Sequence, residues 1–278
     1  MKVKVVLCAL LFLFFSNTSF GQVETYITSK KTKESPYDIT LKRSLVHYGI
    51  GVASYGTAAV LINRLEPLTQ EELNNLDPTD INSFDRGAAY NNSKTARDIS
   101  DIFRNVAWAA PLGMLAGADD LSDRFKEIVL MTTQTAVVSI GVTSLIKGSV
   151  SRIRPTAYNE DWDFETRSST QSQLSFISGH TSAAAAMLFL SAKMYHDYNP
   201  DSKLRPYFWA GAGLGTIAMG YLRYDAGRHW TTDVIVGGAL GAAIGILVPE
   251  SFKKRKVSDE MTIDITPSLS GVGLVARW

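Results

Sequence analysis

The sequence predicts an all-α protein, a compact helical bundle of about six core helices with a helical cap insert and a short C-terminal β-like tail. Three observations predict it: six long apolar stretches, a polar segment between the first two, and a change of periodicity near the C-terminus. The chain has 278 residues, of which 28 are basic and 27 acidic. This balance lacks the basic excess of nucleic-acid-binding proteins, so we expect no nucleic-acid partner.

Residues 1–21 have the pattern of a secretory signal peptide, with a charged start, an apolar stretch over 5–15 and a small-residue exit. The apolar stretch is shorter than the roughly 20 residues that cross a bilayer, which disfavours the alternative of a membrane anchor. Cys8, the only cysteine, lies in this leader, so we expect no disulfide and no thiol nucleophile in the mature chain. Residues 22–40 are polar and predict an extended arm.

Residues 41–252 predict the helical domain. Most of the apolar stretches are rich in alanine and glycine and exceed the length of a strand, which favours helices. The polar segment 64–104 carries helix-start signals such as Thr69 with Glu72, and it predicts a cap insert of short helices. The apolar stretches are 45–63, 105–118, 128–146, 181–192, 207–222 and 233–248.

The tail, 253–278, differs from the rest of the chain. Its basic run, 253–256, is favourable beside the negative end of the last helix dipole. Met261, Ile263 and Ile265 then alternate with polar residues, which is the period of a strand, and 268–278 can pair back as a hairpin.

The apolar stretches leave two alternatives for location. Stretches 128–146 and 233–248 approach the length that spans a bilayer, whereas 105–118 and 181–192 fall short. If all six crossed after a cleaved signal, the basic run 253–256 would lie outside, against the positive-inside tendency. We therefore favour an exported bundle, periplasmic or membrane-associated, over an integral membrane protein with its site facing outside.

Three polar motifs follow one another within 147–233. Lys147 ends one apolar stretch, and Arg154 follows, held in an extended conformation by Pro155. An ammonium and a guanidinium placed in this way can converge on one phosphate. The alternative is an ordinary basic helix end, for which Arg152 would serve as well.

The second motif, Ser178-Gly179-His180, precedes an alanine-rich helix. Backbone amides at a helix start form an anion cradle, and Gly179 would let that backbone approach a ligand closely. Ser178 can cap the helix and donate its hydroxyl, although a plain N-cap explains it equally.

The third motif contains Arg223, His229 and Asp233. On a helix, residues four apart share a face, so Asp233 can accept the His229 Nδ1–H and leave Nε2 as a nucleophile. The rival is a metal site, but zinc needs further ligands, and we expect His47 to pack in the bundle and His196 to lie on the surface. We therefore expect no metal.

Together these residues resemble the type-2 phosphatidic acid phosphatase and vanadium haloperoxidase superfamily, whose pattern is K-x6-RP, PSGH and SR-x5-H-x3-D. Lys147, Arg154 and Pro155 match the first element. The second is matched with Ile177 in place of proline, and the third with Leu222 in place of serine. The resemblance covers roughly 105–250, so it explains neither the 64–104 insert nor the tail, 251–278.

The resemblance implies a phosphatase without metal or other cofactor. His229 would attack phosphorus, with Asp233 orienting it, and His180 would protonate the leaving group. The implied phosphate-binding residues are Lys147, Arg154, Ser178, Gly179 and Arg223. The expected substrates are phosphorylated lipids or small soluble phosphoesters, with possible membrane contact.

Two alternatives stay open at this stage. The same site could hold vanadate in a haloperoxidase, or the chain could be a non-catalytic protein that binds phosphate or lipid headgroups. The polar loop between Thr156 and Ile177 is expected to overlook the site. Its Trp162 and Phe164 could contact a lipid or an aromatic leaving group, or only pack on the bundle.

Overall fold

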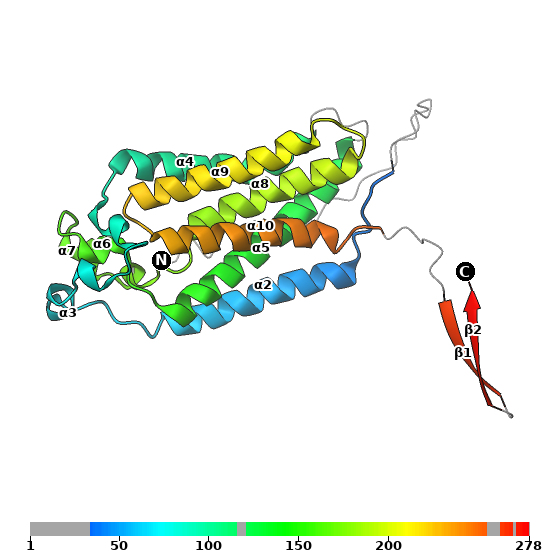
Figure 1. Cartoon of the computed structure of the whole chain (residues 1–278), viewed down its shortest axis with the longest axis horizontal. Coiled ribbons are helices and arrows are strands. Elements are labelled where there is room, and N and C mark those ends of the chain that lie inside the picture. The colour runs from blue at the N-terminus through cyan, green and yellow to red at the C-terminus, as the bar shows by residue number, and fades with distance from the viewer. Residues whose placement is uncertain (1–33, 116–120, 255–261, 269–270, 278) are drawn as a thin grey trace, which may run out of the picture. The chain divides into compact units, whose positions relative to one another are not determined.

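The computed structural model describes residues 34–115, 121–254, 262–268 and 271–277. The expected signal peptide and the arm up to residue 33 lie outside these ranges. Six long helices run alongside one another (Figure 1), which confirms the all-α bundle. They are α2 (Leu41–Ile62), α4 (Lys94–Ala109), α5 (Leu121–Val150), α8 (Gly179–Tyr198), α9 (Arg205–Asp225) and α10 (Thr231–Glu250).

Helix α8 is the central helix of the bundle, packed against α4, α5, α9 and α10. It fits there because its first turns carry the small, fully buried side chains Ala184, Ala185 and Ala186. Met187 and Leu190 follow and join the main apolar core with residues of α5 and α10. Small residues at the crossings allow the neighbouring helices to approach closely.

The helix expected over 105–118 is wrong in its boundaries. Helix α4 begins at Lys94, where the Ser93 side chain accepts from the Ala96 amide as an N-cap, and it ends at Ala109. Residues 110–115 form the 3-10 helix η3, which contains Pro111. Helix α4 is amphipathic, so an apolar stretch marks only its last turns and hides its polar beginning.

The insert contains short helices, as expected, but they occupy only its first part. They are α3 (Gln70–Asn74), η1 (Pro78–Asp80) and η2 (Arg86–Tyr90). Thr69 and Glu72 form a capping box at the start of α3. Between α5 and α8 lie α6 (Pro155–Tyr158), α7 (Phe164–Ser168) and η4 (Thr170–Gln173).

The long helices alternate in direction, and this brings the three motifs to one end. Helices α2, α5 and α9 end where α4, α8 and α10 begin, and α3, α6 and α7 gather at the same end (Figure 1). We call it the motif end. At the opposite end, the buried Asp197 carboxylate accepts from the Tyr37 hydroxyl (2.9 Å) and pairs with Lys253 (2.8 Å). These contacts join the arm to the chain that follows α10.

The tail forms the expected hairpin. Strand β1 (Thr262–Ser268) pairs antiparallel with β2 (Gly271–Arg277), with Thr262 opposite Arg277 and Ser268 opposite Gly271.

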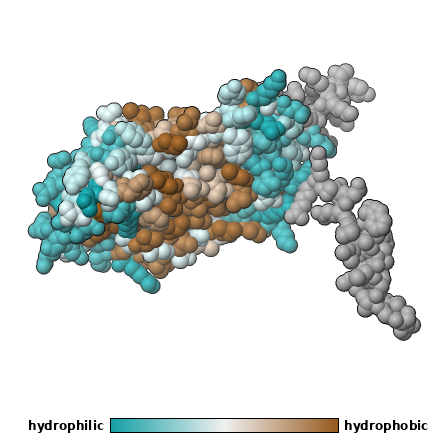
Figure 2. All heavy atoms as spheres, in the orientation of Figure 1, coloured by the Kyte–Doolittle hydropathy of each residue, from teal (hydrophilic) through white to brown (hydrophobic). Residues whose placement is uncertain are grey.

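Large apolar side chains remain exposed along the long helices. Within the described part of the chain, three helical segments are long and apolar enough to cross a membrane: Leu41–Ile62, Arg124–Tyr158 and Thr231–Glu250. Helix α9 adds an exposed apolar face, with Leu214, Ile217 and Tyr221 each more than 60% accessible. Figure 2 shows hydrophobic residues over the middle of the visible face, between hydrophilic ends. So much exposed apolar surface is typical of contact with lipid, and the protein is membrane-associated.

The α2–α5 contact gives a test of this packing. A Cβ on Gly51 would lie 2.5 Å from the Val137 carbonyl oxygen of α5. Gly51→Ala is therefore expected to destabilise the protein by about 1–3 kcal/mol through overpacking, seen as a lower Tm in detergent. Gly49→Ala, in the same helix, has nothing within 4 Å of the added Cβ and is the matched control. Equal Tm values for the two variants would contradict backbone contact between these helices.

Candidate functional site

The first motif lies where α5 ends. Lys147 is in the last turn of α5, and Ser151 follows with φ 47°, the left-handed conformation that terminates helices. Arg154 is the N-cap of α6, with Pro155 at its first position. The two cations converge on one carbonyl oxygen, that of Leu174, at 2.6 Å from Lys147 Nζ and 3.1 Å from Arg154 Nη2. The structure thus brings Lys147 and Arg154 together as predicted.

The second motif begins α8. Ser178 is the N-cap, and its hydroxyl oxygen accepts from the Thr181 amide (3.4 Å) and hydroxyl (2.9 Å). The Ser178 amide donates to the Asp233 carbonyl (3.0 Å), which fixes the start of α8 against α10. Gly179 lies beside the first motif, since a Cβ placed on it would be 3.6 Å from Lys147 Cε.

The third motif lies in the turn between α9 and α10. Arg223 is buried in the last turn of α9, and Gly227 follows with φ 64°. A Cβ on Gly227 would lie 1.9 Å from the Asn91 carbonyl oxygen, so only glycine fits this turn. The prediction that His229 and Asp233 share a helix face is wrong, because α10 begins at Thr231.

The side chain of Asp233 nevertheless lies next to His229, because it folds back toward the N-terminus of α10. Its Oδ2 accepts from the Trp230 amide (3.0 Å), and the same oxygen lies 3.5 Å from His229 Nδ1. That separation exceeds hydrogen-bond length, and His229 Nδ1 is buried without a hydrogen-bond partner. The pair predicted from the four-residue spacing is therefore adjacent but not bonded.

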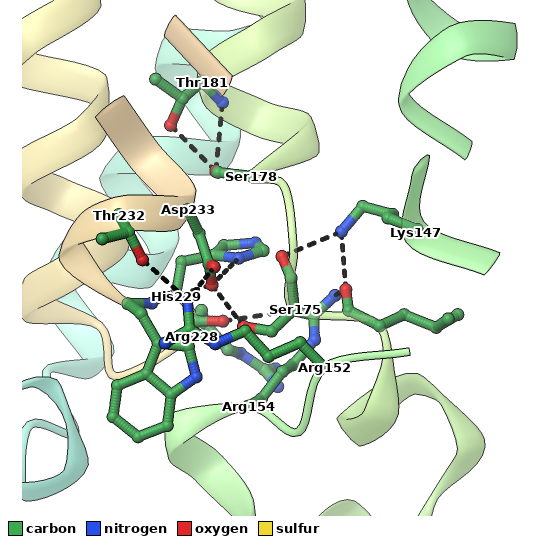
Figure 3. A network of polar contacts seen from close by, with 12 residues as sticks. Lys147, Arg152, Arg154, Ser175, Ser178, Thr181, Arg228, His229, Thr232 and Asp233 are labelled. Atoms are coloured by element: carbon green, nitrogen blue, oxygen red, sulfur yellow. Dashed lines mark hydrogen bonds and ion pairs between the residues drawn. The ribbon is translucent and has the colours of Figure 1, made fainter. Parts of the chain in front are cut away.

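The Asp233 carboxylate is fully buried and has two further partners (Figure 3). Its Oδ1 accepts from Arg152 Nη1 at 2.8 Å, and its Oδ2 accepts from the Ser175 hydroxyl at 2.5 Å. Neither partner was predicted. Arg152, which the sequence left as part of a basic helix end, neutralises the carboxylate beside His229.

Arg152 also joins the cap insert to the site. Its Nη2 donates to Asp85 Oδ2 (2.8 Å), and Asp85 Oδ1 accepts from the Thr232 amide (2.8 Å). Burial opposes ionisation of Asp85, but hydrogen bonds from Arg152 and Thr232 outweigh it and lower the pKa of this carboxyl. Asp85 therefore stays charged and holds Arg152 in place.

His229 is 1% exposed, in an environment that disfavours its protonated form. Burial lowers its pKa well below the ordinary value, and the charges of Arg154, Lys147 and Arg223 lower it further. The imidazole is therefore neutral near pH 7.

His180 lies in the first turn of α8 and faces α4. Its Nε2 is 2.7 Å from Asp101 Oδ1 and 2.8 Å from Arg104 Nη1. Sequence reasoning missed both partners, although Arg97, Asp101 and Arg104 recur at helical spacing on one face of α4.

A polar cavity of about 320 Å³ lies at the motif end, and its described lining does not include Lys147, Ser178, Gly179, His229 or Asp233. His180, Arg154 and Arg223 line it, so the structure brings residues from all three motifs to one cavity. Arg223 Nη1 donates to the Ser100 hydroxyl (2.8 Å), while the Nε atoms of Arg154 and Arg223 are buried without partners. Unsatisfied guanidinium donors around a polar cavity favour an anionic ligand. The other lining residues include Arg97, Asp101 and Arg228.

A metal centre was expected to be absent. Among the residues that the structure describes, no group of three or more His, Cys, Asp or Glu side chains is arranged to hold a metal ion. His47 packs in the bundle as predicted, with Nδ1 2.9 Å from Gln134 Oε1. His196 is half-buried rather than exposed, and its Nδ1 accepts from Trp209 Nε1 at 3.2 Å.

Comparison with known proteins agrees with the motifs. Residues 128–256 match the PAP2 superfamily. Phospholipid phosphatase 1 of Rattus norvegicus is 29% identical over 164 residues, which are 47% of this chain and 57% of that protein. The chain thus spans little more than half of this relative. The resemblance to the PAP2 superfamily is confirmed.

A solved structure is also similar, the first transmembrane PAP2 type phosphatidylglycerolphosphate phosphatase from Bacillus subtilis. It is 18% identical, and the alignment covers 76% of this chain and 94% of that one with a TM-score of 0.42.

The Arg152 contacts predict a stability effect. Arg152→Gln leaves the buried Asp85 and Asp233 carboxylates without their cation, and we expect a loss of about 3 kcal/mol in the free energy of unfolding. Arg152→Lys keeps the charge but cannot bridge both carboxylates, so its Tm should fall between those of wild type and Arg152→Gln. A Tm unchanged in Arg152→Gln would contradict this role.

Proposed function

We propose that the protein is a metal-independent phosphatase that hydrolyses phosphate monoesters of lipids through a phosphohistidine at His229. One observation carries the proposal: a buried, neutral histidine lies beside a buried carboxylate and is influenced by three cations, two of which line a polar cavity. The sequence similarity to a phospholipid phosphatase and to the PAP2 superfamily supports the reaction class.

In the first step, His229 Nε2 attacks phosphorus, and the bond from phosphorus to the leaving oxygen breaks as the N–P bond forms. Asp233 stabilises the positive charge that develops on the ring, as the carboxylate of a catalytic triad does. Its 3.5 Å separation from Nδ1 would shorten on substrate binding, since catalytic hydrogen bonds are often long in free enzymes.

His180 supplies the proton that the leaving oxygen takes up. Burial and the charge of Arg223 lower the pKa of His180 to about 4 in the free protein, so the negative charge of the bound phosphate must raise this pKa before the ring carries the proton. Its position on the cavity wall suits this role, and Asp101, 2.7 Å away, can hold the ring and share its proton. In the second step, His180 takes a proton from water, the water attacks phosphorus, and the P–N bond breaks to release orthophosphate.

The phosphate charge is met by protein groups. Lys147, Arg154 and Arg223 neutralise its oxygens, and the Ser178–Gly179 turn contributes the positive end of α8. Such positioning and charge stabilisation provide most of the catalysis in phosphoryl transfer. In this proposal, no bound metal is needed.

We infer that the substrate is a lipid because the site lies at one end of an apolar bundle. If the phosphate headgroup of a lipid bound at that end, the hydrocarbon chains of the lipid would lie beside the exposed apolar helix faces. We further propose that the bundle spans the membrane with the motif end outside the cytoplasm. Basic residues gather at the opposite end, among them Lys42, Arg43, Lys253 and Lys254, which the positive-inside tendency keeps in the cytoplasm.

Phosphate release by the full chain in detergent, with excess EDTA, tests the reaction. We expect turnover of dispersed phosphatidate, and a loss of at least about a thousandfold in His229→Ala because the nucleophile is removed. His196→Ala, which changes a histidine in the last turn of α8, is the matched control.

Rapid quenching of the same reaction should trap an acid-labile phosphoryl group on wild type but not on His229→Ala. Turnover that stops in EDTA and returns with a divalent cation would contradict metal independence. Peroxide-dependent halide oxidation with vanadate, without phosphate release, would replace the phosphatase by a haloperoxidase.

The lowered pKa of His229 predicts the pH dependence. The neutral imidazole is the nucleophile, and a lowered pKa keeps it neutral as the pH falls through its ordinary value of about 6.5. We therefore expect the acid limb of kcat/KM to lie below pH 6.5. The profile is first corrected for the ionisation of the substrate, which phosphorus NMR measures. A corrected limb at or above 6.5 would contradict a neutral, cation-surrounded His229.

A further inference from the structure

Two cavities lie at the end of the bundle opposite the motif end, where α2 begins and α10 ends. Their volumes are about 600 and 310 Å³, and Arg43 and Ser251 line both of them. The larger cavity also has Lys42 and His47 in its wall, and the smaller one has Lys254. We call the two cavities together the basic pocket. Its other lining residues are Thr40, Val46, Glu250 and Lys253.

The basic pocket is built where three parts of the chain meet. His47 of α2 has its Nδ1 2.9 Å from Gln134 Oε1 of α5, and its Nε2 is 3.3 Å from the Ser251 hydroxyl oxygen after α10. The His47 ring also packs edge-on against Phe252, with 5.2 Å between the ring centroids. These contacts hold the start of α2 against the end of α10, so the walls of the pocket have fixed positions.

The cations of the basic pocket lack anionic partners. Lys42, Arg43 and Lys254 are exposed, and none of them makes a side-chain hydrogen bond or ion pair with another described residue. Glu250 is the one carboxylate in the described lining, and it already pairs with Lys193. Three positive charges are therefore left facing the same space. Like charges gathered in this way attract an anion and are relieved of mutual repulsion when it binds.

An apolar surface adjoins these cations on the same helix. In the first turns of α2, Leu41 is 75% accessible, Leu45 60% and Val46 54%, and Val46 also lines the larger cavity. Figure 2 shows the same arrangement over the visible face, where a hydrophilic end meets the hydrophobic middle of the bundle. A soluble anion would contact only the cations, whereas a ligand with a charged head and hydrocarbon chains would contact both surfaces. The surroundings of the pocket therefore favour a lipid over a free anion.

We propose that the basic pocket binds the headgroup of an anionic phospholipid of the surrounding membrane. The lipid phosphate is held by Lys42, Arg43 and Lys254, and the acyl chains lie along the exposed apolar side chains of α2. Clusters of Lys and Arg beside membrane helices recognise anionic headgroups in this way. The bound lipid is not the substrate, because the pocket lies at the other end of the bundle from His229. The inference is therefore independent of the proposed reaction.

Native mass spectrometry of the full chain tests the basic pocket by counting bound lipids. The protein is released from micelles that contain dioleoylphosphatidylglycerol or, for comparison, dioleoylphosphatidylcholine. We expect one phosphatidylglycerol per chain to be retained in preference to phosphatidylcholine. The double variant Lys42→Gln/Arg43→Gln should need about thirtyfold more phosphatidylglycerol for the same occupancy, because each basic residue near an anionic headgroup contributes about fivefold in affinity.

The matched control is the double variant Arg64→Gln/Lys94→Gln. Arg64 and Lys94 are also exposed, and they lie at the motif end outside the basic pocket, so this variant loses the same charge elsewhere. It should retain phosphatidylglycerol as wild type does. Both double variants should match the Tm of wild type in phosphatidylcholine micelles, since substitutions of exposed residues change stability little. Added phosphatidylglycerol should then raise the Tm of wild type and of the control, but not that of Lys42→Gln/Arg43→Gln.

Three results would overturn the proposed lipid site. The first is equal retention of phosphatidylglycerol by wild type and Lys42→Gln/Arg43→Gln, and the second is an equal loss in the control variant, which would indicate diffuse attraction to charge. The third is a rise in Tm with soluble sn-glycerol 3-phosphate that depends on Lys42 and Arg43, which would replace the lipid by a free anion. A chain that retains the lipid as expected but releases no phosphate from phosphatidate keeps the basic pocket and refutes only the proposed phosphatase.

Discussion

The buried carboxylate of Asp233 is the group around which the motif end is organised. Burying a charge is costly unless it is paired and hydrogen-bonded. Here Arg152, Ser175 and the Trp230 amide meet that cost. The three partners come from the chain after α5, from the segment before α8 and from the start of α10. Satisfying one carboxylate therefore fixes three parts of the chain relative to one another, and it leaves His229 Nδ1 facing an oxygen that is already ordered.

The cations have the opposite character, because their charge is left largely unpaired. Lys147 and Arg154 donate to the Leu174 carbonyl, and Arg223 donates to a hydroxyl, so none of these contacts removes charge. A cavity built in this way is electrostatically unfavourable when empty and favourable with an anion inside. Burial lowers the pKa of His229, and the charges of these cations lower it further, so the groups proposed to hold the phosphate help to keep the nucleophile neutral.

The spacing of the three motifs predicted which residues meet, because each motif lies within a few residues of a helix end and the helix directions alternate. The sequence could not reveal contacts that depend on distant pairing. Asp85 and Arg152 are 67 positions apart, and only the folded insert brings them together. The polar face of α4 that carries Arg97 and Asp101 could have been predicted from the sequence, since its polar residues recur at helical spacing. It was missed because the helix was sought in an apolar stretch that begins at 105.

The structure also constrains the orientation of the chain in a membrane. Tyr37 contacts Asp197 and bridges to Lys253, so the arm and the start of the basic run lie at the same end, opposite His229. In a bundle that spans the membrane, a cleaved signal would export the arm and leave the site in the cytoplasm. The basic run favours the reverse, with the site outside. From the sequence alone, a cleaved export signal and a site facing outside are compatible. If the bundle spans the bilayer, the structure makes these two predictions incompatible.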